Sequence, residues 1–360
     1  MIVAPQTEKE TPVSKHEKRG AAAFPAQTLW AIREDVLPTL EAIMEGALSQ
    51  EEARERLGLS KAAAQTSQVA GGSVAVISLQ GVITPRGGLL SMLLGIGGGG
   101  LQGFRTSFRE ALSDESVSSV LLVVDSPGGL IDLVPETAAE IRGARGTKPI
   151  VAIANTDAAS AAYWIASQAD ELVVTPSGQV GSIGVFVRHE DFSRMDEMMG
   201  VKTTLIRAGK FKAEANPFEP LNDAAKGHLQ ETVDDLYGMF VADVAAGRGV
   251  KAADVKGGYG EGRMVLAKDA VAEGMADREA TFEETVASMT GESSPGSRAQ
   301  ALAPQVEAEA PEAEAEAIEP VVEAPEPEAE VEVPAEVAAE APEAEMSEED
   351  RRRLVDVLLD

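Results

Sequence analysis

Between residues 73 and 285, short apolar runs alternate with amphipathic stretches. The runs predict strands and the amphipathic stretches predict helices, and this alternation is typical of βα units that build a largely parallel, buried sheet. The predicted strands are Val74–Leu79, Val120–Asp125, Ile150–Ala154, Glu171–Val174, Gly184–Arg188 and Thr203–Ala208. The predicted helices are Leu101–Leu112, Pro135–Arg142, Ser160–Ser167, Phe192–Met199 and Asn222–Ala246. The sequence therefore predicts one α/β domain of ordinary size for a single core.

The residues before this domain divide into a leader and an extension. Residues 1–24 are polar, with mixed charge and no periodicity, which predicts disorder. Within residues 25–65, apolar side chains recur at helical spacing, and Ser49 with Glu52 forms a capping box for a second helix. The apolar residues are Leu29, Ile32, Val36, Leu40, Ile43 and Met44. We expect a helical hairpin that packs on the main domain or on a partner.

The residues after the domain have a different composition. Residues 291–346 consist largely of Ala, Glu, Pro and Val, and Ala299–Met346 contains 15 Glu, seven Pro and no Asp, Lys or Arg. Such a segment buries too little apolar surface to offset the entropy of ordering it, so we expect a disordered acidic tail. Residues 347–360 combine a capping box at Ser347 with an apolar stripe of Leu354, Val357 and Leu358. They predict a short amphipathic helix that docks on a partner.

Composition narrows the chemistry that this chain can use. The net charge of −29 is concentrated in the tail, so we expect no nucleic-acid partner. The absence of Cys excludes thiolate nucleophiles, and three His leave little for a metal site, so we expect no metal and no cofactor. Without a long apolar run or the apolar core of a signal peptide, we expect a soluble intracellular protein with no membrane partner. Catalysis would use Ser, Lys or carboxylates.

A pair of glycines follows the predicted strand Val120–Asp125. Gly128 and Gly129 let the backbone turn with N–H groups directed into a cleft at the carboxyl edge of the sheet, as an oxyanion hole requires. Taken alone, a Pro-Gly-Gly sequence after a strand is more often an ordinary turn.

A serine follows the next predicted strand and opens a helix, in the sequence Asp157-Ala-Ala-Ser-Ala-Ala-Tyr-Trp164. The positive end of the helix dipole would favour an alkoxide at Ser160, although an isolated serine here is more often an ordinary N-cap. The small side chains of Ala161 and Ala162 would let a peptide backbone approach the hydroxyl.

Lys212 lies in the sequence Gly209-Lys-Phe-Lys-Ala-Glu-Ala-Asn-Pro-Phe218. Burial against Phe211 and Phe218 would keep it neutral and able to act as a general base, whereas a solvated surface lysine is the ordinary case. His189 lies in a polar run and His228 in a charged helix, so both are expected at the surface. Lysine is therefore the base by elimination.

In this order, the motifs resemble the signal peptide peptidase A family of serine peptidases, relatives of ClpP and of the crotonase fold. The resemblance extends from about Val74 to Asp277 and includes the motifs Val180–Val185 and Gly262–Asp277. It implies a Ser–Lys dyad with Ser160 as the nucleophile, Lys212 as the general base and Ser182 as the hydroxyl that orients the lysine. It also implies an oxyanion site at the N–H groups around Gly128 and Gly129, and rings in which a neighbouring subunit can supply the lysine. Many members have Ser-Gly-Gly where this chain has Ser-Ala-Ala, which would tighten the substrate pocket at Ala161 and Ala162.

The N-terminal Leu29–Ile32 segment, a single peptidase domain and a C-terminal tail together resemble the tailed-phage head maturation proteases of this family. That resemblance implies capsid and scaffold proteins as substrates and partners, a scaffold-like tail, self-cleavage and a homo-oligomer. It also implies a location in the host cytoplasm and, transiently, inside the assembling prohead. One alternative is a cytosolic bacterial peptidase that degrades signal peptides or fragments. The other, a crotonase-like acyl-CoA enzyme or an inactive scaffold, leaves the Ser160 and Lys212 motifs unexplained.

One further segment, Arg86–Gly100, contains seven Gly and six large apolar residues. It fits a lid that grips substrate and fits an interface-buried loop equally well.

Overall fold

The computed structural model describes residues 28–44, 48, 49, 52, 56, 67, 68, 74–87 and 100–291, which all lie in the unit Met1–Ala303. The expected leader, acidic tail and terminal helix lie outside the described residues, as do most of the segment Arg86–Gly100 and most of the second N-terminal helix. The capping box predicted for that helix is present. The backbone N–H and Oγ of Ser49 donate to the Glu52 carboxylate at 2.9 and 2.7 Å, and the Glu52 N–H donates to Ser49 Oγ at 3.3 Å.

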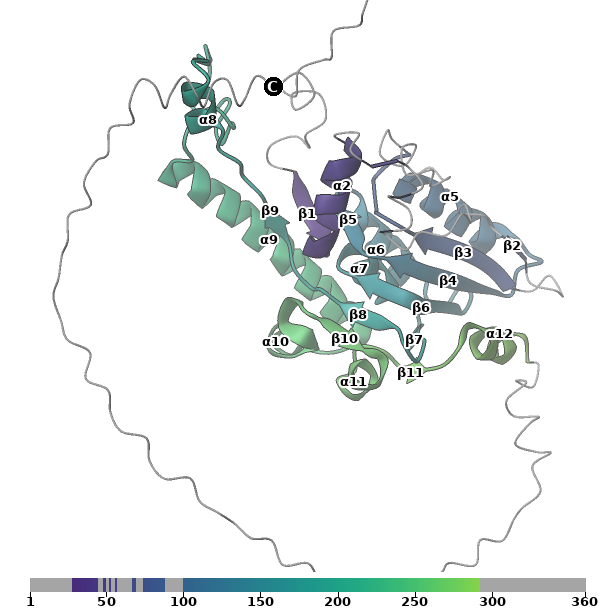
Figure 1. The fold of residues 1–360 in the computed structure, drawn as a ribbon. Helices are drawn as coiled ribbons and strands as arrows, with labels where there is room; N and C mark the ends of the chain where they lie inside the picture. Colours follow the sequence, from purple (N-terminus) through teal and green to yellow (C-terminus); the bar gives the residue numbers. More distant parts are fainter. Residues whose placement is uncertain are drawn as a thin grey trace, which may run out of the picture. The chain divides into compact units, whose positions relative to one another are not determined.

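An eight-stranded sheet forms the centre of the unit (Figure 1). Its strands are β2 (Ser67–Gln68), β3 (Val74–Gln80), β4 (Ser119–Ser126), β6 (Ile150–Ala159), β7 (Glu171–Val174), β8 (Gln179–Gly181), β10 (Met264–Leu266) and β11 (Arg278–Glu279). The order is β10-β8-β6-β4-β3-β2, with β7 paired to β6 and β11. Pairing is antiparallel at β2 and β10 and parallel elsewhere. The predicted largely parallel α/β sheet is confirmed.

Helices bury both faces of the sheet. One face packs with α5 (Gly100–Ser113), α6 (Val134–Ala144), α7 (Ala161–Ala166) and α9 (Asp223–Arg248), and the other with α12 (Phe282–Thr290). Alternate residues of β4 serve the two sides, since Leu122 belongs to the first core and Leu121 to the second. The continuous apolar run in the sequence follows from this two-sided burial. Among the described helices, none is long and apolar enough to cross a membrane.

The N-terminal segment corrects the prediction of a helix beginning at Leu29. Residues Leu29–Ile32 form strand β1, and only then come a 3-10 turn (Glu34–Val36) and α2 (Leu37–Met44). Strand β1 is the middle strand of a separate three-stranded sheet, antiparallel to β5 (Gly128–Leu130) and to β9 (Phe186–Val187). Trp30 and Ala31 are buried in two different apolar clusters, because successive side chains of a strand point to opposite sides. Both sides of this segment are therefore apolar, and its pairing with β5 and β9 makes it a strand rather than a helix.

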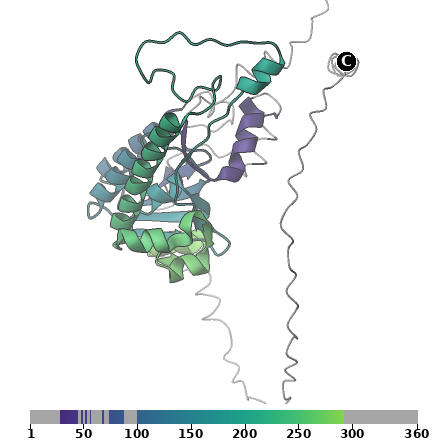
Figure 2. The same ribbon diagram turned by 90° about the vertical axis from the view of Figure 1, so that its left-hand side faces the viewer.

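Two other predicted strands differ from the structure. Gly184–Arg188 is shortened to β9, and Thr203–Ala208 forms no strand. The latter lies between α8 (Ser193–Met198) and α9, in a segment that extends away from the sheet in both views (Figures 1 and 2). Ile206 is 99% exposed there. A strand needs a neighbouring strand, and the described part of this chain places none beside it.

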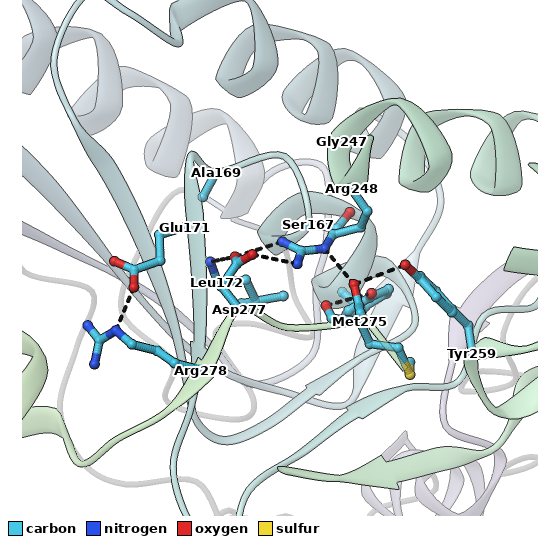
Figure 3. A network of polar contacts seen from close by, with 12 residues as sticks. Ser167, Ala169, Glu171, Leu172, Gly247, Arg248, Tyr259, Met275, Asp277 and Arg278 are labelled. Atoms are coloured by element: carbon cyan, nitrogen blue, oxygen red, sulfur yellow. Dashed lines mark hydrogen bonds and ion pairs between the residues drawn. The ribbon is translucent and has the colours of Figure 1, made fainter. Parts of the chain in front are cut away.

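A polar network joins the end of α9 to the last strands of the domain (Figure 3). Arg248 donates to both carboxylate oxygens of Asp277 at 2.8 Å and to the Gly274 carbonyl at 3.1 Å. The Leu172 N–H donates to the same carboxylate at 2.7 Å, and Tyr259 Oη donates to the Gly274 carbonyl at 2.9 Å. Burial raises the pKa of Asp277, but the hydrogen bonds from Arg248 and Leu172 outweigh it and hold that pKa below its usual value. The Gly262–Asp277 motif therefore has a structural role here.

Replacing Asp277 with asparagine should lower the free energy of unfolding by about 1–2 kcal/mol at pH 7, because Arg248 stays buried without its counter-charge. Since the pKa of Asp277 is depressed in the folded chain, its stabilisation is present above the unfolded value of about 3.9 and is lost as the pH falls through the folded value. The free energies of unfolding of wild type and D277N, measured by denaturant titration, should therefore become equal in acid. The exposed Asp235 provides the control, since D235N should have the wild-type free energy of unfolding at pH 7. An equal loss in the two variants would contradict the assignment.

Candidate active site

Ser160 forms the sharp turn between β6 and α7. Its φ of 53° and ψ of −118° are unusual for a residue with a side chain and are held by bonds on both sides. Its N–H donates to the Gly181 carbonyl at 2.7 Å, and its carbonyl accepts from the Trp164 N–H at 2.9 Å. The side chain does not cap α7, and Oγ instead makes a long contact of 3.5 Å with the Gly184 carbonyl. The ordinary N-cap interpretation is therefore wrong for this serine.

Gly128 lies directly against Ser160. With φ at 95°, a Cβ at position 128 would lie 3.0 Å from the Cβ of Ser160 and 2.3 Å from the carbonyl oxygen of Ala31, so only glycine fits. The Gly128 N–H donates to Ser126 Oγ at 3.1 Å, and that buried hydroxyl donates to the Gly81 carbonyl at 2.6 Å. The structure thus brings the predicted glycine turn to the predicted nucleophile. It also adds Ser126, which lies in the same motif and which sequence reasoning left without a role.

Gly129 continues the turn into β5. A Cβ on Gly129 would lie 2.0 Å from the carbonyl oxygen of Ile83, so this position also requires glycine. The Ile83 N–H donates to the Gly128 carbonyl at 2.8 Å, and the Leu130 N–H donates to the Ile83 carbonyl at 2.9 Å. These bonds fix the backbone of the turn against Ile83.

Helix α7 is held rigidly under the serine. Trp164 stacks on Phe240 with the ring centroids 4.4 Å apart, and its indole N–H donates to Asp243 at 2.9 Å. Ala161 and Ala162 are completely buried in the main core. They support the turn from below, and their contact with a substrate stays a prediction.

Ser182 lies on the loop that borders the serine. It follows β8, is half-buried, and is flanked by Gly181 and Gly184, whose carbonyls face Ser160. Its φ is 51°, and its N–H donates to the Arg263 carbonyl at 2.9 Å. Three of the predicted elements, the glycine turn, Ser160 and the Ser182 loop, are therefore neighbours.

Lys212 is not part of this group. It is exposed, in a turn between α8 and α9, where its N–H donates to the Gly209 carbonyl at 3.1 Å. Phe211 and Phe218 are 60% and 41% exposed, so this single chain does not provide the apolar surroundings expected for a neutral lysine. No hydrogen bond joins Lys212 to Ser160 within the described residues.

A charged pair beside the serine was not predicted from the sequence. Arg33, which follows β1, forms an ion pair with Asp157, three residues before Ser160, and another with Asp35 at 2.6 Å. Burial and the nearby Asp125 raise the pKa of Asp157, and Arg33 offsets this only in part. The only sequence signal was a basic residue directly after the apolar segment Leu29–Ile32. The described residues contain no cluster of three or more His, Asp or Glu side chains that could hold a metal ion.

The arrangement around Ser160 and a family match together indicate a serine peptidase. Adjacent parallel strands β4 and β6 deliver a glycine turn and a strained serine to the same sheet edge, and β8 delivers the bordering loop. Residues 143–294 match the model of peptidase family S49. The resemblance inferred from the motifs is confirmed.

Two phage proteins and one solved protease structure are among the proteins similar to this chain. The chain is 33% identical over 220 residues to capsid assembly protease C of Escherichia phage lambda, covering 61% of this chain and 48% of the relative. It is 32% identical over 206 residues to the head-tail preconnector protein GP5 of Enterobacteria phage P21, covering 57% and 40%. The chain thus spans about half or less of these relatives. A membrane protease from Pyrococcus horikoshii, 1510-N, specific for a stomatin homolog, is a structural neighbour with 15% identity and a TM-score of 0.36, covering 61% and 79%.

Proposed function

We propose that this chain is a serine endopeptidase that uses a Ser160–Lys212 dyad to process capsid and scaffold proteins, and itself, during maturation of a phage head. The observation that carries the proposal is the strained, uncapped Ser160, which packs against the Gly128 turn and lies within the residues that match family S49. Similarity to the lambda capsid assembly protease supports the choice of substrates. The site of action would be the host cytoplasm and then the assembling head.

In the proposed mechanism, Ser160 Oγ attacks the scissile carbonyl carbon while its proton passes to Nζ of a neutral Lys212. N–H groups of the Gly128–Gly129 turn donate to the resulting oxyanion, and for the Gly128 N–H this means leaving Ser126 Oγ, its acceptor in this structure. The lysine then gives the proton to the departing amine, and water repeats the two steps to release the acid. Ser182 would orient the lysine.

Because Lys212 lies apart from Ser160 within one chain, the mechanism requires a second copy. The segment between β9 and α9 carries exposed apolar side chains, which are typical of surfaces that associate. They are Met198, Met199, Val201, Ile206, Phe211 and Phe218. We therefore propose a homo-oligomer in which this segment of one copy covers the site of the next, buries its apolar residues and supplies Lys212 there.

Self-cleavage tests the proposed function directly. The acidic segment between Ser297 and Ala344 offers many Ala-rich sites, and small side chains suit a turn lined by alanines. Mass spectrometry of purified wild type should show loss of C-terminal fragments, whereas S160A purified in parallel should keep an intact C-terminus. An intact wild-type tail under conditions in which the enzyme cuts other proteins would contradict self-cleavage. Identical truncation in S160A would assign it to a contaminating protease.

A further inference from the structure

Strand β1 lies in a distinctive place, next to the catalytic turn and outside the main sheet. It runs antiparallel to β5, with Ala31 opposite Gly129 and Ile32 opposite Gly128. Its other edge pairs with β9, where Leu29 lies opposite Val187. A four-residue extended segment is therefore held by backbone pairing on both edges, which is how an extended peptide binds when it adds to exposed strands.

The backbone of β1 passes the reacting atoms at Ala31. The Ala31 carbonyl oxygen and the Ser160 Cβ lie 2.3 and 3.0 Å from one point, the place where Gly128 would carry a Cβ. A peptide carbonyl thus already lies close to both the glycine turn and the nucleophile. Ser160 itself has no exposed surface in this state. A substrate carbonyl therefore cannot reach the Ser160 hydroxyl unless a neighbouring segment moves away. Strand β1 is the segment that lies beside that serine.

Side chains on both sides of β1 hold it in place. Trp30 and Ile32 pack into a small cluster that is separate from the main core. The other members of that cluster are Val36, Leu37, Leu40, Ile43 and Val82. Ala31 faces the main core and is fully buried. At the end of the strand, the Arg33 N–H donates to the Pro127 carbonyl at 2.8 Å, and its side chain pairs with Asp157.

We propose that Leu29–Ile32 is an internal occupant of the peptide channel between β5 and β9, and that a substrate enters only when β1 leaves. This inference rests on the proposed function and deepens it, because the occupant shows what the channel accepts. A substrate segment would be extended, with a small side chain at the position of Ala31, and the channel would accept side chains as large as those of Trp30 and Ile32 at the two flanking positions.

A reversible cross-link tests the proposal in the full chain, which contains no Cys. Leu29 and Val187 are directly opposed, and the Cα separation of antiparallel partners suits a disulfide. The double variant L29C/V187C should hydrolyse a fluorescently labelled unfolded protein when reduced. Oxidation should lower the rate at least about tenfold, because the channel can no longer be vacated, and reductant should restore it. The control is Q179C/L266C, which joins the opposed partners of β8 and β10 and should be equally active in both redox states.

The outcomes separate this inference from the function on which it rests. An oxidised L29C/V187C enzyme that keeps its reduced rate would overturn the inference and leave the protease assignment standing. If no variant and no wild type hydrolyses the substrate, the proposed function fails, and amide exchange in S160A decides the inference instead. Adding excess isotopically labelled peptide of residues 28–35 should then increase exchange in the chain's own Leu29–Ile32. Unchanged exchange would overturn occupancy of a shared channel.

Discussion

Replacing Ser160 with alanine should abolish proteolysis, with a rate loss of at least about 10³-fold, while the protein stays folded. The substitution removes the atom that forms the acyl-enzyme bond but removes only one long contact, the 3.5 Å approach of Oγ to the Gly184 carbonyl. The backbone bonds from residue 160 to Gly181 and Trp164 do not involve the side chain. The measurements are hydrolysis of a labelled unfolded protein and the thermal unfolding midpoint.

The matched control is Ser113, a serine at the end of α5 whose hydroxyl donates only to the Arg109 carbonyl of its own helix. S113A should retain the wild-type rate. Undiminished hydrolysis by pure S160A would remove Ser160 as the nucleophile. If S160A loses both its activity and its cooperative thermal unfolding transition, the side chain of residue 160 is needed to keep the turn folded, and the backbone of that turn is already strained.

The parts of the site that the sequence predicts are those set by local pattern. The apolar runs that became β4 and β6 are long and buried on both faces, so they identify two neighbouring parallel strands. Residues that directly follow neighbouring parallel strands meet at one sheet edge, and the pairing of Gly128 with Ser160 follows from that rule. The signal at β8 is weaker, because Gln179–Gly181 has one apolar residue and ends in glycine.

The parts that the sequence does not predict depend on distant partners. The apolar residues of Leu29–Ile32 fit helical spacing as well as strand alternation, and only the edges of β5 and β9 decide between them. The extent of β6 is another example, since the predicted strand Ile150–Ala154 continues to Ala159, where Asp157–Ala159 pairs with β8. For Lys212, the surroundings that would make it a base are absent from the described part of a single chain.

Replacing Lys212 with alanine should abolish proteolysis as completely as loss of Ser160, because a nucleophile without its base disables the same step. The matched control is Lys210, two residues away, whose Nζ lies 4.6 Å above the Phe211 ring. K210A should lose little activity, since it removes one exposed cation–π contact. An inactive K210A with an active K212A would reverse the assignment of the base.

Mixing the two inactive variants then locates the lysine. If neighbouring copies share the site, a Ser160 from a K212A chain can meet a Lys212 from an S160A chain, and an equal mixture should recover activity at about a quarter of the sites. The chains must be mixed under conditions that exchange subunits, with light scattering to confirm the oligomer. Met198 and Ile206, 82% and 99% exposed in one chain, should become protected from solvent in that oligomer. Mixed oligomers that stay inactive would place Ser160 and Lys212 in the same chain, and the segment between α8 and α9 would then have to fold back onto its own sheet.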